Sequence, residues 1–201
     1  MKSKIIFLSL SIAFLLHACA SEDNSNASKE IKSLSEADKR EFILKGREIA
    51  KETFVTLSIA LKEKINEGGI QHAVDYCNIA ALPLSDSIAD ANNVILRRVS
   101  SRYRNPANKP DSLENEVIAS YLSAKEEGEK LRPQLIELDG EVHFYAPIET
   151  KGLCLSCHGE PGKFISDADY AFIKEKYPDD LAINFTTGEL RGIWSIKFLD
   201  E

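Results

Sequence analysis

The sequence predicts an α+β domain in which helices come first and an antiparallel sheet follows. Apolar residues recur at helical spacing over residues 42–61, and a second helical pattern covers residues 70–84. The second half of the chain instead holds short apolar runs that are separated by turn residues. Helices followed by hairpins are typical of α+β folds, in which the helices pack on one antiparallel sheet.

The helix boundaries follow from capping residues and helix breakers. Ser35 can cap a helix that runs to about Glu67, and Gly68-Gly69 ends it. A second helix begins near Ile70, and we expect Pro83 to kink or break it because proline lacks the N–H that a helix interior requires. Two later helices are predicted, from Asp111 or Ser112 to about Glu127 and from Ser166 or Asp167 to near Tyr177-Pro178.

The strands are predicted from short apolar runs and from the turns between them. The candidate strands are residues 94–99, 135–138, 142–148, 181–185 and 190–198. Asp139-Gly140 joins the second and third runs and is a strong signal for a two-residue hairpin turn. The last two runs flank residues 186–189, which predict a second hairpin.

The N-terminus resembles a bacterial lipoprotein leader. Lys2 and Lys4 precede an apolar run, residues 5–16, that is too short to span a bilayer as a helix. The run leads into Leu16-His17-Ala18-Cys19, a lipobox-like sequence in which Cys19 would be lipidated. An ordinary signal peptide, cut near Ala18 or Ala20, is the alternative.

These features divide the chain into three parts. We expect a signal peptide at residues 1–18, a flexible polar tether at residues 19–34 and one folded domain at residues 35–201. The protein would then be a lipoprotein, anchored through Cys19 to the inner or outer membrane on the periplasmic side of the cell envelope. The net charge of −7 argues against nucleic-acid binding and against electrostatic docking on anionic lipid.

One motif points to a cofactor. The run Cys154-Leu155-Ser156-Cys157-His158 has the Cys-x-x-Cys-His spacing at which c-type haem is attached. Each thiol can form a thioether with one haem vinyl group, and His158 can become the proximal iron ligand. We therefore expect one covalent haem c. A dithiol or disulfide, or a zinc site that adds Cys77 to the motif, is the alternative.

The composition of the chain limits which residues could be the second iron ligand. Met1 is the only methionine and would leave with the signal peptide, so the His/Met pair of ordinary cytochromes c is excluded. Cys77, His72, His143, a lysine or an open position remain. Cys77 lies on the apolar face of its helix, whereas His72 lies among polar side chains. Because an unpaired cysteine is unusual in an oxidising compartment, we favour Cys77 over a buried core thiol.

The haem propionates would need cationic partners. Strand alternation places Arg98, Arg102 and Arg104 on one side of the chain and turns Arg97 away from them. Arginine binds carboxylates through paired hydrogen bonds, so these three side chains are candidates, with solvated surface charges as the alternative. Tyr145 and Trp194 are candidates to pack on the porphyrin, although aromatic residues on sheets are more often plain core.

Together these segments resemble a known family, the exported c-type haem-binding PAS-like domains, once known only as a domain of unknown function. The resemblance covers about residues 36–198. It rests on the haem motif and on residues 73–78, 98–111, 145–148 and 188–192. The resemblance implies a PAS-like antiparallel sheet with N-terminal helices. It also implies an unusual His/Cys pair of iron ligands, here His158 and Cys77.

Three functions of different classes are compatible with these features. The first is a redox or gas sensor, which the PAS-like resemblance favours and which would need a signalling partner. The second is a membrane-tethered electron carrier with a redox partner protein. A haem enzyme such as a peroxidase is not expected, because its open iron site would need a distal acid/base pair that the sequence does not suggest.

Overall fold

The computed structural model describes residues 33–199. The predicted signal peptide, most of the tether and the predicted lipidation site Cys19 lie outside these residues. Within the described part of the chain, none of the helices combines the length and the apolar character that crossing a membrane requires.

The first helix, α1 (Glu36–Asn92), is two helices joined at a break. Ser35 caps its start, and its side chain accepts a hydrogen bond from the backbone N–H of Asp38. Inside Glu36–Asn92 the backbone leaves helical geometry only at Gly68 and Gly69, and Gly69 has a φ of 78°. The predicted break between the two helices is therefore confirmed, because only glycine adopts this conformation readily.

Pro83 does not break the second half of α1, which continues to Asn92. A proline at this position removes the hydrogen bond to the carbonyl of Ile79. Both residues lie on the exposed side of the helix, where water can satisfy that carbonyl. The expectation of a break at Pro83 is thus wrong, because the cost of the missing N–H falls at a solvated position.

The sheet has four antiparallel strands in the order β1-β4-β3-β2. The strands are β1 (Val94–Val99), β2 (Gln134–Leu138), β3 (Glu141–Glu149) and β4 (Leu190–Phe198). Asp139 and Gly140 join β2 to β3 with φ angles of 53° and 81°, so the first predicted hairpin is confirmed.

The second predicted hairpin is wrong. Residues 181–185 form no strand, and β4 pairs instead with β3 and with β1. The backbone groups of this segment bond to loops: Leu181 N–H donates to Tyr103, Asn184 N–H to Gly159, and Phe185 N–H to His158. Residues 180–185, which we call the strap, therefore cross beside the cysteine motif rather than extend the sheet.

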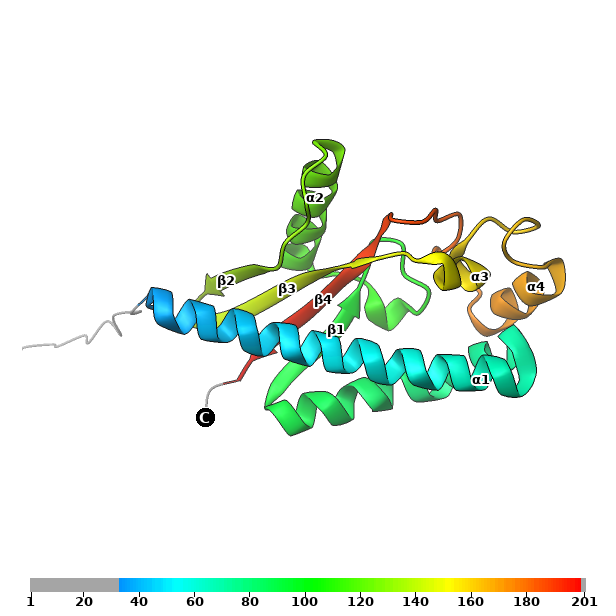
Figure 1. Cartoon of the computed structure of the whole chain (residues 1–201), viewed down its shortest axis with the longest axis horizontal. Helices are drawn as coiled ribbons and strands as arrows, with labels where there is room; N and C mark the ends of the chain where they lie inside the picture. Colours follow the sequence, from blue (N-terminus) through cyan, green and yellow to red (C-terminus); the bar gives the residue numbers. More distant parts are fainter. Residues whose placement is uncertain (1–32, 200–201) are drawn as a thin grey trace, which may run out of the picture. The chain divides into compact units, whose positions relative to one another are not determined.

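The helices cover the two faces of the sheet (Figure 1). Helix α1 packs on the face that carries Phe144, Trp194 and Ile196, and comes so close at Gly46 that a side chain there would overlap the Phe144 ring. Helix α2 (Ser112–Glu126) packs on the opposite face. An antiparallel sheet with a long N-terminal helix is the PAS-like arrangement that the sequence predicts.

The segment between β3 and β4 carries the cysteine motif. It contains the 3₁₀ turn η2 (Gly152–Cys154), the short helix α3 (Leu155–His158) and helix α4 (Asp167–Lys176). Helix α4 lies against α1, and its Ile173 packs in one cluster with Val74 of α1 and with Cys157. The second half of α1 is therefore brought beside the motif (Figure 1).

Candidate functional site

The cysteine motif lies on the segment between β3 and β4, and Thr150 joins the two ends of this segment by hydrogen bonds. This buried residue ends the path of β3, and its N–H donates to the carbonyl of Glu189 over 2.9 Å. In return, the N–H of Gly188 donates to the Thr150 carbonyl over 2.9 Å. The hydroxyl of Thr150 also donates to the carbonyl of Thr186. These hydrogen bonds tie the entrance of the segment to its exit.

The motif itself forms about one helical turn. Cys154 ends η2, and Cys157 and His158 lie in α3, so the two thiols are one turn apart, as the spacing predicts. Leu155, which points inward from this turn, is buried against Ala182 and Phe185 of the strap. The buried leucine holds the turn in place while both thiols stay partly accessible.

His158 has a fixed orientation. Its Nδ1 lies 2.8 Å from the carbonyl oxygen of Ala182, and its ring meets Phe185 edge to face at 6.3 Å between centroids. Because a carbonyl oxygen can only accept, Nδ1 must carry the proton, and Nε2 keeps its lone pair for a metal. Burial, followed by the charges of Arg191 and Arg104, holds the pKa of His158 well below its usual value. The imidazole is therefore neutral, which is the form that ligates.

Cys77 lies in the second half of α1, after the break at Gly68 and Gly69. Burial raises the pKa of its thiol, while the charges of Arg98 and Arg104 act in the opposite direction. Burial is the main cause that raises the pKa of the Cys157 thiol to about 11. Charge on Cys77 adds to this upward shift. The two thiols are therefore near enough for their charges to interact, although they come from different elements.

Arg104 connects the motif to the strap. Its guanidinium donates to the carbonyl of Cys157 and, over 3.0 Å, to the carboxylate of Asp180. The Asp180 side chain is fully buried and also accepts the N–H of Ala182 over 2.8 Å. One buried ion pair thus fixes the strap residue whose carbonyl orients His158.

Arg98 and Arg102 have different surroundings. Arg98 pairs across the sheet with Trp194 and therefore faces α1; burial lowers its pKa, and the charges of Cys77 and Tyr177 oppose this shift. The guanidinium of Arg102 lies 3.7 Å from the ring centroid of Phe185 and donates to the carbonyl of Ile183. Arg98 thus lies with the thiols, whereas Arg102 packs on the far side of the strap.

Sequence reasoning assigned no role to Arg191, although the segment that contains it contributed to the family resemblance. Arg191 is the second residue of β4, and it donates to the carbonyl of Arg102 over 3.0 Å. Burial, and then repulsion by Arg104, lower its pKa to about 9. Its Nε and that of Arg104 are buried without a hydrogen-bond partner within residues 33–199. The buried Nε–H of Arg191 therefore lacks an acceptor, and this feature, which only the structure reveals, identifies Arg191 as part of the site.

Several candidate residues lie elsewhere. Tyr145 is buried on the α2 face of the sheet. It lies opposite Ser195 of β4, which in turn lies opposite Arg97 of β1. The His143 ring stacks on the Tyr145 ring with 6.3 Å between centroids. His72 is half exposed and pairs with Glu67 over 3.2 Å. Trp194 belongs to the core under α1. The structure therefore does not bring Tyr145, His143 or His72 to the cysteine motif.

The positions of the three cysteines test the alternative interpretations of the motif as a disulfide or a zinc site. Cys77, Cys154 and Cys157 are all free. Among the described residues, no three His, Cys, Asp or Glu side chains gather closely enough to hold a metal ion.

The charges beside the motif fit a group with carboxylates. Arg98, Arg104 and Arg191 lie beside the motif with one buried carboxylate, that of Asp180, among them. Two buried guanidinium N–H groups lack an acceptor. Paired carboxylates, such as haem propionates, would provide acceptors and offset the excess positive charge. The residues present therefore fit a haem beside the motif.

Comparisons with known proteins relate the chain to a haem-protein family. The chain is similar to a solved structure described as the crystal structure of the cyanobacterial heme-protein Tll0287, with 26% identity and a TM-score of 0.52. The match covers 77% of this chain and 96% of that one. No curated protein matches. The model of the Tll0287-like family matches residues 17–198. Since this match spans nearly the whole chain, the protein belongs to the Tll0287-like family.

Proposed function

We propose that the chain is a monohaem c-type cytochrome of PAS-like fold that acts in redox or gas sensing. Cys154 and Cys157 would form the thioethers, and His158 would be an axial ligand. The observation that carries this proposal is the hydrogen bond between His158 Nδ1 and Ala182, which presents Nε2 for ligation directly after the two thiols. The similarity to a cyanobacterial heme-protein supports it.

Cys77 would be the second iron ligand in this proposal. It is the ligand-type side chain on α1 whose charge acts on Cys157, whereas His72 and His143 have partners elsewhere. Bound haem would supply a one-electron centre, and a thiolate ligand would favour its ferric form and so lower its reduction potential. The chain contributes the two ligands from separate elements, α3 and α1.

The arginines would hold the carboxylates. Arg98, Arg104 and Arg191 each carry a guanidinium that is buried near the motif, and Asp180 keeps Arg104 in place. Arg102 packs on Phe185 and so would position the strap beside His158. We assign Tyr145 to the core of the α2 face rather than to the cofactor.

Sensing is preferred to electron carrying because of where the two ligands lie. His158 is fixed by the strap, while Cys77 lies on α1 beyond the break at Gly68 and Gly69. A sensor needs one ligand that can leave and an element that reports its departure, and α1 provides both. An electron carrier would keep both ligands in place. We propose a binding and signalling role rather than catalysis.

The lipoprotein-like N-terminal leader suggests where the protein would act and which partners it would meet. We propose that Cys19 is lipidated and that it anchors the protein on the periplasmic side of the envelope, where haem c is attached. A sensor in this position would act through a signalling partner. An electron carrier would meet a redox partner protein instead. The acidic chain makes nucleic acid an unsuitable partner.

One optical experiment tests this proposal. The protein is produced together with the haem-attachment machinery, and its spectra are recorded oxidised and reduced, with and without carbon monoxide. A covalent haem spectrum that shifts on addition of carbon monoxide only after reduction supports a sensor with a releasable ligand. An unchanged reduced spectrum favours the electron carrier. A protein that contains zinc and lacks haem contradicts the proposal.

A further inference from the structure

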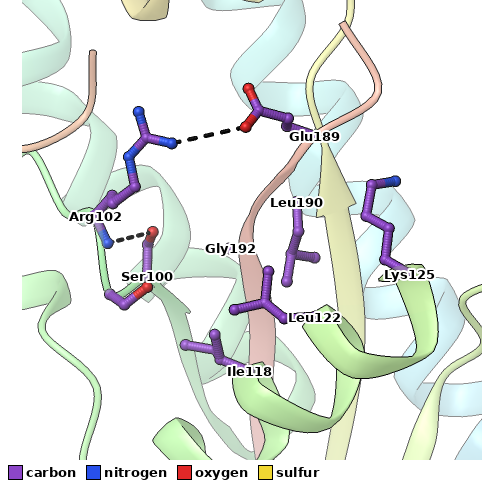
Figure 2. Close-up of a pocket in the computed structure, with 9 residues that line it drawn as sticks. Ser100, Arg102, Ile118, Leu122, Lys125, Glu189, Leu190 and Gly192 are labelled. Atoms are coloured by element: carbon purple, nitrogen blue, oxygen red, sulfur yellow. Dashed lines mark hydrogen bonds and ion pairs between the residues drawn. The ribbon is translucent and has the colours of Figure 1, made fainter. Parts of the chain in front are cut away.

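A cavity lies beside Arg102, and no residue of the cysteine motif lines it. It has a volume of about 170 Å³ and lies between α2, the residues that follow β1 and the start of β4. Its walls are Ile118 and Leu122 of α2 and Leu190 of β4 (Figure 2). We call it the α2 cavity. An apolar cavity of about 150 Å³ can hold a molecule as large as benzene, so this space is large enough for a short aliphatic group.

The opening of the α2 cavity carries both signs of charge. Figure 2 shows the guanidinium of Arg102 and the carboxylate of Glu189 facing each other above the apolar side chains, with Lys125 at another edge. The Arg102–Glu189 pair is loose, with 3.9 Å between Nη1 and Oε1, and both side chains are about 40% exposed (39% and 40%). A pair of this kind contributes little to stability and is easily exchanged.

Each member of the pair can bind a ligand without losing its own support. The second oxygen of Glu189 already accepts from the N–H and the hydroxyl of Thr186. Arg102 is held by its contact with Phe185 and by its bond to the carbonyl of Ile183. The free Nη1 of Arg102 and Oε1 of Glu189 are therefore a donor and an acceptor on fixed side chains.

We propose that the α2 cavity binds an aliphatic α-amino acid. The ligand carboxylate would take the place of Glu189 on Arg102, and the ligand ammonium would take the place of Arg102 on Glu189. These two charged groups lie on one carbon of the ligand, a spacing that matches a side-chain pair at 3.9 Å. The aliphatic side chain would enter between Ile118, Leu122 and Leu190. This site is separate from the proposed haem site and does not require it.

Calorimetric titration of the purified full-length protein tests this proposal. The probes are L-leucine, 4-methylpentanoate, which lacks the ammonium group, and 3-methylbutylamine, which lacks the carboxylate. We expect L-leucine to bind and both analogues to bind about tenfold more weakly or worse, because each leaves one charge of the pair unmatched. Absence of heat with L-leucine at millimolar concentration overturns the proposal. Equal binding of 4-methylpentanoate overturns the assignment to an amino acid.

Two leucines provide a matched pair of variants. Leu122 in the cavity and Leu138 at the end of β2 have nearly equal exposure, 44% and 45%, so neither side chain is part of the buried core. Leu122→Trp fills the cavity and should weaken L-leucine binding about tenfold or more. Leu138→Trp should leave it unchanged. Glu189→Gln should remove the preference for L-leucine over 4-methylpentanoate. Equal affinities in the two tryptophan variants contradict the proposed location.

Discussion

The Nδ1 of His158 and the carbonyl oxygen of Ala182 lie 2.8 Å apart, and this contact sets the tautomer of the proposed axial imidazole. Ala182 is itself held by Asp180, whose carboxylate accepts its N–H and pairs with Arg104. The orientation of the ligand therefore depends on a buried ion pair that belongs to no recognisable motif.

Removing the carboxylate of Asp180 should destabilise the protein strongly. Asp180→Ala leaves the Arg104 guanidinium beside Arg191 without its counterion, and breaking a buried pair in this way costs about 3–5 kcal/mol. Urea unfolding measures the loss. The control is Glu160→Ala, which removes an exposed pair with Lys163 and should change stability very little. Similar effects of the two substitutions would mean that the buried pair is not structurally important.

Each substitution of a motif cysteine should remove one covalent bond to haem, and loss of both should remove covalent attachment. Cys154→Ser and Cys157→Ser each remove one thioether, and the double variant should release all its haem on acid extraction. Intact-protein mass spectrometry reports the retained mass. Cys77→Ser is the control, because the proposed axial ligand forms no thioether and its variant should keep haem covalently. Haem that survives extraction from the double variant would refute attachment at this motif.

Replacement of Cys77 should change the electronic state of the iron. Cys77→Ser should abolish the low-spin thiolate signature in the electron paramagnetic resonance spectrum, because the sulfur ligand is lost. It should also raise the reduction potential by about 60 mV or more, which is a tenfold shift toward the ferrous form. An unchanged spectrum and potential would identify Cys77 as an ordinary core residue.

The break in α1 should be intolerant of a side chain at Gly69. The φ of 78° there is unfavourable for any other residue, so Gly69→Ala should reduce stability by about 1–3 kcal/mol. Gly152→Ala is the matched control, since no heavy atom lies within 4 Å of a Cβ there and its φ is not positive. Thermal or urea unfolding distinguishes the two variants, and equal stabilities would show that the break relaxes without cost.

Membrane attachment should depend on Cys19. Cys19→Ala removes the thiol that a lipid would modify, so we expect the variant to leave the membrane fraction, in which the unmodified sequence stays. Cell fractionation with immunoblotting measures this difference. An identical distribution of both proteins would indicate an ordinary signal peptide that is cut near Ala18 or Ala20.

The parts of the fold that local chemistry determines could be predicted from the sequence. Asp139-Gly140 adopts positive φ angles and forms its hairpin, and Gly68-Gly69 divides α1, because each pair specifies its own backbone geometry. Residues 181–185 could not be predicted in this way. Their short apolar run is that of a strand, but distant loops at Tyr103, His158 and Gly159 supply their hydrogen-bond partners.

The site shows the same division. The spacing of Cys154, Cys157 and His158 is readable from the sequence. Strand alternation also separates Arg98 from Arg97, which pairs with the buried Glu114 at 2.7 Å. Arg191 could not be found in this way. Its position in β4 resembles that of any polar strand residue until the fold places it against Arg102 and Arg104.

The hydrogen bonds of Thr150 have a consequence for folding. They join the chain immediately before the cysteine motif to the turn that precedes β4, and β3 and β4 pair directly beyond them. The segment that carries the motif is therefore a closed loop whose ends meet in the sheet. Pairing of the two strands already meets the entropy cost of closing that loop, so the proposed haem would have only the interior of the loop left to order.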